Sequence, residues 1–261
     1  SHYFEHVRRY VPLDPLQFPF HLLTRSGRID YENLRLRDPL FVAAVDGWFA
    51  GTAVTSIQAA GTQIVAPSRL FAPPPLFAPL RLRGLRPVNR VVLSPPPTYS
   101  AEDGKPQDRQ LVDAARRGAG LVMTEIVAVS PDGRITPGCA GLYRPEHVSA
   151  WRRLVEAVRA TAEAPILIQL GHAGRRGSTR PRGRGLDRPL LTGNWPLLSA
   201  SALPYTSQSQ IPKEMDRDAM DRVRDDFTRA ASMADEAGFD MIQLHMAHGY
   251  LLASFISPLT N

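Results

Sequence analysis

An alternation of short apolar runs with amphipathic helical patterns is the feature that most constrains how this chain can fold. Four apolar runs predict strands, and they span residues 88–94, 120–125, 166–170 and 239–245. Apolar residues at helical spacing predict three helices between them, over residues 108–117, 145–162 and 216–237. Strands that alternate with helices form βαβ units, and continuously apolar strands are typical of a parallel sheet covered on both faces. The sequence therefore predicts an α/β fold.

Polar residues end each of the four predicted strands: Ser94, Glu125, Gln169 and His245. In parallel α/β folds the ligand binds beyond the carboxyl ends of the strands, which all lie at one rim. Because four successive strands each bring a polar group to this rim, we expect an active site of the barrel type there.

The strongest motif is HMAHGYLL at residues 245–252. Its two histidines, His245 and His248, can face one ligand, and as neutral rings they could donate to an anionic oxygen or a ring carbonyl. Tyr250 is suited to donate a proton to a developing carbanion. The same residues are equally compatible with a structural role, as histidines that cap a helix and a tyrosine in the core. A metal site would need further ligands, and because His172 is the only other nearby candidate, no metal is expected.

Two further motifs place polar groups at strand ends. In IQLGHAGR at residues 168–175, the carboxamide of Gln169 offers a donor and an acceptor that suit the edge of a heterocycle, and the glycines permit close approach. Turn formation would explain the same residues. In NRVVLSPPPTYS at residues 89–100, Ser94 can bind a ligand through its hydroxyl and backbone, and Tyr99 could cover a flat ring. No G-x-G-x-x-G motif follows a strand, so the sequence carries no dinucleotide fingerprint.

Prolines mark the part of the chain that precedes the α/β region. Ten of the 24 prolines lie between residues 67 and 106, which excludes regular helix and central strand at those positions. Residues 51–75 are interpreted as a linker, and residues 1–50 as the end of another unit with a short amphipathic helix at 41–49. The main domain then covers residues 76–261.

Composition narrows the classes of function. The net charge is +6, and six arginines crowd into residues 175–188 without aromatic residues between them, which favours a solvated loop over a nucleic-acid surface. The single cysteine, Cys139, excludes an internal disulfide framework. The chain has no run of about 18 apolar residues and no apolar signal core at its start, so we expect a cytoplasmic protein without a membrane partner.

Taken together, the motifs resemble the old yellow enzyme family of FMN-dependent ene-reductases over about residues 70–261. Five separated motifs and a closing segment follow the family pattern in order: LFAPLRLRGL with NRVV (76–92), LVMTE (121–125), SPDGRI (130–135), IQLGHAGR (168–175), HMAHGYLL (245–252) and FISPLTN (255–261).

This resemblance implies an FMN cofactor, with NAD(P)H as the reductant of the flavin. Ser94 and Gln169 would contact the FMN ring system, and the backbone around Pro95 would lie beside it. Ile126 occupies a position where the family has a small residue, so its side chain would lie against the flavin and crowd it.

The resemblance also implies how a small-molecule substrate is reduced. His245 and His248 would hold and polarise its electron-withdrawing oxygen, and Tyr99 would contact it. FMN would deliver hydride to the β-carbon of an activated C=C bond, and Tyr250 would supply the proton.

The start of the chain resembles a second kind of protein. The segments FHLLTRSGRI (20–29) and LRLRDP (34–39) are similar to the C-terminal end of a flavoprotein monooxygenase half. Such a half precedes an old-yellow-enzyme half in bifunctional salicylyl-CoA 5-hydroxylase and anthraniloyl-CoA monooxygenase/reductase proteins. This resemblance implies an aromatic acyl-CoA-derived ring intermediate as the substrate.

The number of strands implies part of a barrel. Asn261 follows soon after the fourth predicted strand, whereas the family barrel has eight strands. The expected fold is therefore the N-terminal half (about four strands) of a (β/α)₈ TIM barrel, preceded by a small mostly helical segment and a Pro-rich linker. Because four parallel strands cannot close a barrel, we expect this polypeptide alone to bind FMN weakly or not at all.

The alternative to the FMN-dependent ene-reductase function is a truncated, non-catalytic fragment of a bifunctional monooxygenase/reductase. The sequence leaves open the choice between NADH and NADPH, and between a monomer and a homo-oligomer.

Overall fold

The computed structural model describes residues 39–40, 42–45, 47–48, 51, 75–107, 110–181, 183, 185 and 187–261. The chain divides into two units, residues 1–78 and 79–261. In the first unit, the described residues of the expected 41–49 helix, at 42–45 and 47–48, are helical. A single 3-10 turn, η2 (Pro75–Phe77), follows near the end of that unit. The rest of the expected monooxygenase-like tail and most of the 51–75 linker lie outside the described residues.

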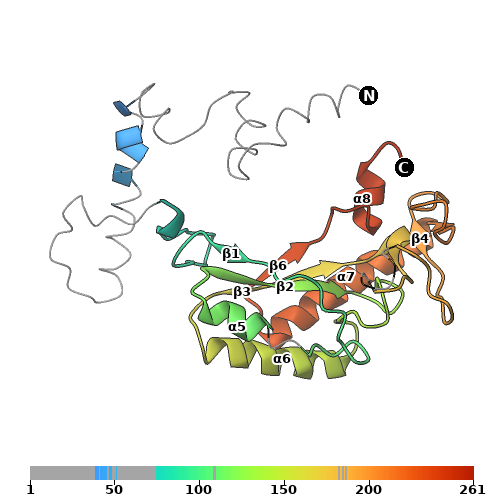
Figure 1. Cartoon of the computed structure of the whole chain (residues 1–261), viewed down its shortest axis with the longest axis horizontal. Helices are drawn as coiled ribbons and strands as arrows, with labels where there is room; N and C mark the ends of the chain where they lie inside the picture. Colours follow the sequence, from blue (N-terminus) through green and yellow to red (C-terminus); the bar gives the residue numbers. More distant parts are fainter. Residues whose placement is uncertain are drawn as a thin grey trace. The chain divides into compact units, whose positions relative to one another are not determined.

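A parallel four-stranded sheet forms the centre of the second unit. Its strands run in the order β1 (Val92–Leu93), β2 (Leu121–Ala128), β3 (Ile166–Gly171) and β6 (Met241–Leu244). Each neighbouring pair is parallel. Between these strands the chain forms α5 (Gln110–Arg116), α6 (Pro145–Arg159) and α7 (Arg217–Ala237), which lie together on one side of the sheet in Figure 1. The predicted α/β fold with a parallel sheet is confirmed.

Short elements that the sequence did not predict lie toward the carboxyl ends of the strands. A 3-10 turn, η3 (Gly174–Arg176), follows β3. The two-residue strands β4 (Leu198–Ser199) and β5 (Lys213–Glu214) form a separate parallel pair. A six-residue helix, α8 (Leu251–Ile256), follows β6.

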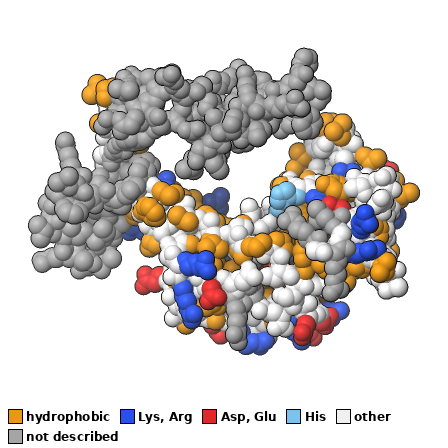
Figure 2. All heavy atoms as spheres, viewed as in Figure 1, with side chains coloured by type: hydrophobic (Ala, Val, Ile, Leu, Met, Phe, Trp, Pro, Cys, Tyr) orange, Lys and Arg blue, Asp and Glu red, His pale blue; other side chains and the backbone are white. Residues whose placement is uncertain are grey.

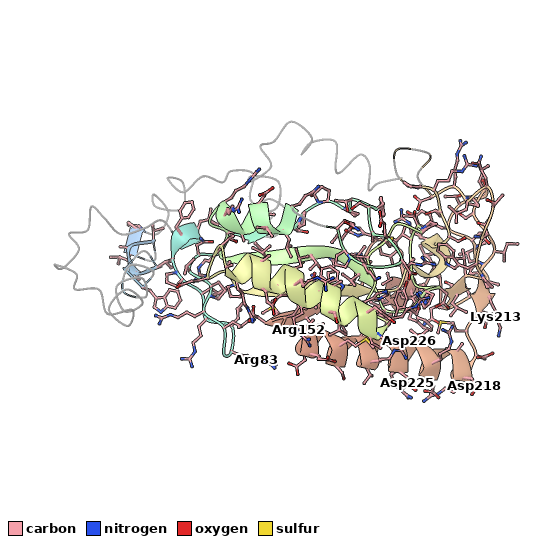
Figure 3. The ribbon with its side chains drawn as sticks, turned by 90° about the horizontal axis from the view of Figure 1, so that it is seen from below. Arg83, Arg152, Lys213, Asp218, Asp225 and Asp226 are labelled. Atoms are coloured by element: carbon pink, nitrogen blue, oxygen red, sulfur yellow. The ribbon has the colours of Figure 1, made fainter. Side chains whose placement is uncertain are left out.

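Local signals explain the ends of the long helices. Asp216 caps α7, because its Oδ1 accepts a hydrogen bond from the Ala219 N–H at 2.9 Å. Gly238 closes α7 in the left-handed conformation, with φ 92°. Arg152 of α6 lies beside α7 in Figure 3, and its Nη2 donates to the Glu236 carbonyl at 2.9 Å. Within the described residues, no helix combines the length and apolar character of a membrane span.

The hydrophobic core lies between the sheet and this layer of helices. Trp151 of α6 is its largest fully buried side chain, and it meets the Phe239 ring edge-on at a centroid distance of 5.6 Å. The indole N–H of Trp151 donates to the Gly141 carbonyl at 3.0 Å, so this polar atom is satisfied inside the core. From β3, every second residue joins the core: Ile166, Ile168 and Leu170. The alternate residues of β3 therefore face the other side of the sheet.

Tertiary pairing changes the predicted strand ends. Strand β1 covers only Val92–Leu93 of the expected 88–94. Strand β2 continues to Ala128, with a register shift between Met123 and Ile126, so the prediction that Glu125 ends this strand is wrong. A β-bulge lets a strand continue past an irregular position, and single-sequence periodicity does not reveal it.

The last strand also departs from the expectation of full burial. Strand β6 spans Met241–Leu244 of the expected 239–245. The side chains of Ile242 and Leu244 are 40% and 51% exposed. Within the described sheet, β6 pairs with β3 and lies at an edge, where an apolar sequence alone does not ensure burial.

Replacing Gly238 with Ala is expected to lower the free energy of unfolding by about 1 kcal/mol. The nearest atom to an added Cβ, Nη1 of Arg159, would be 3.6 Å away, so the loss comes from the φ of 92° and not from a clash. Urea unfolding followed by circular dichroism measures the change. Gly84→Ala is the matched control, because a Cβ there meets nothing within 4 Å and its φ lies outside the left-handed region. Equal stability of both variants would contradict the strain argument.

Candidate functional site

A cavity of about 550 Å³ lies at the carboxyl ends of the four strands. This volume is within the range of about 300–1,000 Å³ that is usual for small-molecule sites. The lining residues are Ser94, Pro95, Pro97, Met123, Glu125, Ile126, Gln169, Gln243, Leu244, His245, Met246, Ala247, His248 and Tyr250. Figure 2 shows histidine side chains (pale blue) at the surface of the unit formed by residues 79–261. The cavity lies at the rim where the strand-end pattern predicts a site.

The structure brings most of the predicted site residues to this cavity. Seven of them line it: Ser94, Pro95, Ile126, Gln169, His245, His248 and Tyr250. Tyr99 is not among the lining residues, and it packs with Tyr250 against the buried cluster that contains Ile126 and Cys139. Its predicted contact with the substrate stays a prediction.

Three lining residues form one row across the sheet. Ile126 of β2 is in register with Gln169 of β3, which is in register with Gln243 of β6. Gln169 is 8% exposed, and its Nε2 donates to the Met123 sulfur at 3.8 Å. Two carboxamides and an apolar side chain therefore stand side by side in the cavity. Sequence reasoning missed Gln243, although in the strand predicted over residues 239–245 it lies two residues before His245, which places both side chains on the same face.

Glu125 ties the loop after β1 to the cavity. Its carboxylate accepts hydrogen bonds from the Thr98 backbone N–H and the Thr98 hydroxyl, both at 3.1 Å. The loop carries Pro95 and Pro97, which also line the cavity. This contact fixes one wall of the site, and the sequence showed only the polar residue and not its partner.

The two histidines contact each other directly. His248 Nδ1 and His245 Nε2 are 3.0 Å apart, so one N–H is shared between the rings. Burial, together with the charge of the nearby His248, holds the pKa of His245 below its usual value. His245 is therefore neutral near pH 7.

A tight turn presents His248 to the cavity. The Tyr250 N–H donates to the Ala247 carbonyl at 3.2 Å, and the two central residues, His248 and Gly249, have φ of 58° and 70°. Positive φ at both central positions is typical of a type I′ turn. The turn aims the His248 ring back at His245, and it sets Tyr250 at the start of α8.

Tyr250 completes a cluster of three rings. Its ring centroid lies 5.1 Å from that of His245 and 6.1 Å from that of His248. Burial raises the pKa of the Tyr250 phenol to about 12, and the Arg176 guanidinium opposes this rise. The phenol therefore keeps its proton at neutral pH and can act as an acid.

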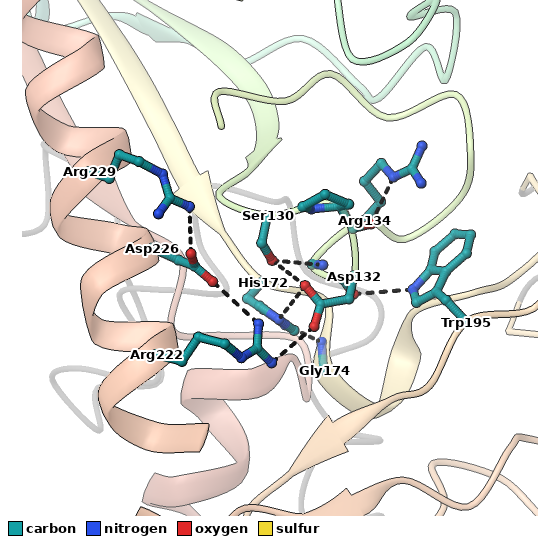
Figure 4. A network of polar contacts seen from close by, with 11 residues as sticks. Ser130, Asp132, Arg134, His172, Gly174, Trp195, Arg222, Asp226 and Arg229 are labelled. Carbon is teal, nitrogen blue, oxygen red and sulfur yellow. Dashed lines mark hydrogen bonds and ion pairs between the residues drawn. The ribbon is translucent and has the colours of Figure 1, made fainter. Parts of the chain in front are cut away.

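His172, the only other nearby histidine that the sequence offered as a metal ligand, belongs to a separate buried network (Figure 4). Its Nδ1 accepts a hydrogen bond from the Gly174 N–H at 3.1 Å, so the ring proton is on Nε2, 4.0 Å from Asp132 Oδ1. Asp132 accepts hydrogen bonds from the Ser130 hydroxyl at 2.6 Å and from Arg222 at 3.1 Å. This network joins the loops after β2 and β3 to α7. Among the described residues, no group of three His, Cys, Asp or Glu side chains is placed to hold a metal ion.

Residues 75–261 match the sequence pattern of the NADH:flavin oxidoreductase / NADH oxidase family. The NADPH dehydrogenase of Bacillus velezensis is 36% identical over 191 residues, which are 71% of this chain and 52% of that protein. The NADPH dehydrogenase of Listeria monocytogenes is 39% identical over the same length and the same shares. The chain spans about half the length of the curated relatives it matches.

Solved structures of related fold agree with these sequence matches. Morphinone reductase superposes with a TM-score of 0.62 at 28% identity, over 72% of this chain and 52% of that chain. An old yellow enzyme homologue from Zymomonas mobilis gives a TM-score of 0.61 at 28% identity, over 72% of this chain and 53% of that one.

Proposed function

Because the chain belongs to the NADH:flavin oxidoreductase / NADH oxidase family, we propose that it acts in an FMN-dependent oxidoreductase that reduces an activated C=C bond, with NAD(P)H as the reductant. The observation that carries this proposal is the ring cluster of His245, His248 and Tyr250 in the same cavity as the carboxamide row of Gln169 and Gln243.

The residues of the cavity fit the ring system of FMN. The edge of a flavin presents alternating donors and acceptors, and the carboxamides of Gln169 and Gln243 can match both kinds. Pro95, Met123 and Ile126 add apolar surface for a flat ring. Within the described residues, no Lys or Arg lines the cavity. The lining residues can therefore contact the flavin ring of FMN, but they provide no positive charge to bind its phosphate group. When bound, FMN supplies the hydride.

The histidine pair is suited to bind an oxygen of the substrate. Each imidazole ring carries at least one N–H group, and one of these is used in the bond between His245 and His248. One N–H is therefore free to donate to a carbonyl or similar oxygen, and a second becomes free when the ring–ring bond opens. Hydrogen bonds to this oxygen stabilise the negative charge that develops there when hydride reaches the β-carbon.

Tyr250 is the proposed proton donor. Its phenol holds its proton at neutral pH, and its ring stands beside both histidines. The proton would pass from the Tyr250 hydroxyl to the carbanion next to the polarised group.

We infer that residues 79–261 correspond to about half of a (β/α)₈ barrel. Four consecutive parallel strands with their helices on one side support this, as does a sequence match that covers only 52% of the Bacillus velezensis relative. The exposed apolar side chains of Ile242 and Leu244 on the edge strand β6 also support it. The resemblance of residues 20–29 and 34–39 to bifunctional monooxygenase/reductase proteins supports an aromatic acyl-CoA-derived ring as the substrate.

Replacing both His245 and His248 with Ala in the FMN-loaded oxidoreductase that contains this chain is expected to slow reoxidation of the reduced flavin by an activated enone about 100-fold. Flavin reduction by NAD(P)H should change only a few-fold, because it does not need the substrate oxygen to be polarised. Anaerobic stopped-flow absorbance of the flavin separates the two half-reactions. Met246→Ala is the matched control, since Met246 lines the same cavity but donates no hydrogen bond. Unchanged reoxidation in the double variant would refute the proposed function.

A further inference from the structure

Arg176 joins three separate parts of the molecule. It ends η3, directly after β3. Its Nε and Nη2 donate to the two carboxylate oxygens of Asp187, each at 2.8 Å, and its Nη1 donates to the His248 carbonyl. The side chains of Arg176 and Asp187 are only 13% and 15% exposed. The guanidinium is thus held rigidly between the loop at Asp187 and the turn that carries His248.

The turn that Arg176 contacts needs outside support. His248 has φ 58°, a conformation that side chains other than glycine rarely adopt, and such strain persists only where neighbouring contacts hold it. A Cβ on Gly249 would lie 3.1 Å from Tyr205 and 3.8 Å from Arg176 Cδ, so the turn packs closely against both side chains. The bond from Arg176 to the His248 carbonyl is the side-chain contact that holds the backbone of this residue, and the ring of His248 is bonded separately to His245.

Arg176 also brings a positive charge to Tyr250. Its guanidinium carbon lies 5.2 Å from the Tyr250 ring centroid and 4.1 Å from that of Tyr205. The titratable and charged groups that act on or face Tyr250 are Tyr99, Cys139, Arg176, Asp187, His245 and His248. In this described set, Arg176 carries the only permanent positive charge.

We propose that Arg176 is a positioning residue for proton transfer: it holds the His248–Gly249 turn and stabilises the phenolate form of Tyr250. The proposal rests on the proposed function, in which the carbanion electron pair takes the proton and forms the new C–H bond. The O–H bond of Tyr250 breaks in this step, and its electron pair stays on the phenol oxygen. The cation beside the ring favours that phenolate until water returns a proton.

Charge and geometry can be separated by three substitutions. Arg176→Gln removes the positive charge and the planar guanidinium that donates two parallel hydrogen bonds, whereas Arg176→Lys keeps the charge. Asp187→Asn keeps the Arg176 cation but removes the negative charge that opposes it at Tyr250. A purely structural role predicts that Arg176→Gln and Asp187→Asn act alike, since both break the same ion pair. The electrostatic role predicts opposite shifts of the Tyr250 pKa.

The direct test is the pKa of the phenol, measured without FMN. We would place 3-fluorotyrosine at position 250 in the full chain and follow its ¹⁹F resonance against pH, since fluorine lowers the phenol pKa into a convenient range. Arg176→Gln is expected to raise this pKa by about one unit, and Asp187→Asn to lower it. Arg176→Lys should stay near the unsubstituted chain. Arg175→Gln is the matched control, because Arg175 stacks on Tyr205 at 5.4 Å and should leave the pKa unchanged. Shifts of the same sign in Arg176→Gln and Asp187→Asn, or none in either, would overturn the proposal.

Turnover separates this proposal from the proposed function. With an activated enone, Arg176→Gln should lower kcat about 10-fold with a smaller change in KM, and the loss should disappear in a Tyr250→Phe background. If Tyr250→Phe itself leaves turnover unchanged, the proton-donor role fails while the fluorotyrosine shift still tests Arg176. If Tyr250→Phe slows turnover but Arg176→Gln changes neither kcat nor the phenol pKa, the role of Arg176 fails alone. Should Arg176→Gln not fold, the downward shift in Asp187→Asn remains the deciding result.

Discussion

Replacing Tyr250 with Phe is expected to slow reduction of an activated alkene by about 100-fold or more, the usual range for loss of a general acid. The phenol is the proton source beside His245 and His248, and its raised pKa of about 12 keeps it protonated. Flavin reduction by NAD(P)H needs no proton from Tyr250, so that half-reaction should change only a few-fold. The ring itself remains, which limits the change in packing.

Single-turnover reoxidation by an enone, in the reduced, FMN-loaded oxidoreductase that contains this chain, measures this loss. Tyr205→Phe is the matched control, because Tyr205 also stacks on Arg176 but does not line the cavity. A phenol with a pKa of about 12 stays protonated up to about pH 10, so the native rate should not fall through phenol deprotonation below that pH. Equal reoxidation rates for Tyr250→Phe and the native chain would remove Tyr250 from the mechanism.

The second large effect concerns stability in acid. Burial lowers the pKa of His172 from its ordinary value of 6.5 to about 4. Between these two values the unfolded chain binds a proton that the folded chain does not, so folding stability falls as the pH decreases from about 6.5 to about 4. His172 should therefore cost the native chain about 2 kcal/mol of unfolding free energy between pH 7.5 and pH 5.0.

Replacing His172 with Asn should remove this part of the pH dependence. The Asn Oδ1 can take the place of Nδ1 as acceptor for the Gly174 N–H, but the side chain does not titrate. Urea unfolding of both chains at pH 7.5 and 5.0 gives the two differences, and only the differences are compared, because the smaller side chain also changes packing. His147 and His245, whose pKa values burial lowers as well, contribute equally to both chains.

Asp132, the neighbour of His172, does not disturb this comparison. Burial acts to raise its pKa, but the Ser130 hydrogen bond and the charges of His172 and Arg222 outweigh burial and hold the pKa below 3.8. Its contribution to stability is therefore present above about pH 4 and is lost only in stronger acid. An identical loss of stability between pH 7.5 and 5.0 in both chains would show that His172 is not buried as a neutral ring.

The ends of helices and strands are predicted best where they depend on residues close to each other in the chain. The apolar spacing predicts a helix over residues 216–237, within one residue of α7, because periodicity acts within a few positions along the chain. The strand ends were less accurate. The bulge between Met123 and Ile126 and the exposed edge at β6 depend on pairing partners far away in the chain.

The candidate site shows the same division. The rule that ligands bind beyond the carboxyl ends of parallel strands predicted Gln169 and His245, which line the cavity, since each lies at the end of a recognisable strand. The hydrogen bond between Glu125 and Thr98 joins residues 27 positions apart, and the sequence did not predict it, because side-chain partners across loops leave no periodic pattern.

The sequence by itself determined the α/β order of elements and the identity of the ring cluster at the rim, His245, His248 and Tyr250. These follow from periodicity and from residues adjacent in the chain. Only the tertiary structure decided which groups surround that cluster. Arg176 reaches Asp187 eleven residues away and His248 seventy-two residues away, because β3 and β6 pair and bring their following loops together. Long-range pairing of this kind sets the electrostatic surroundings of Tyr250, and no local pattern encodes it.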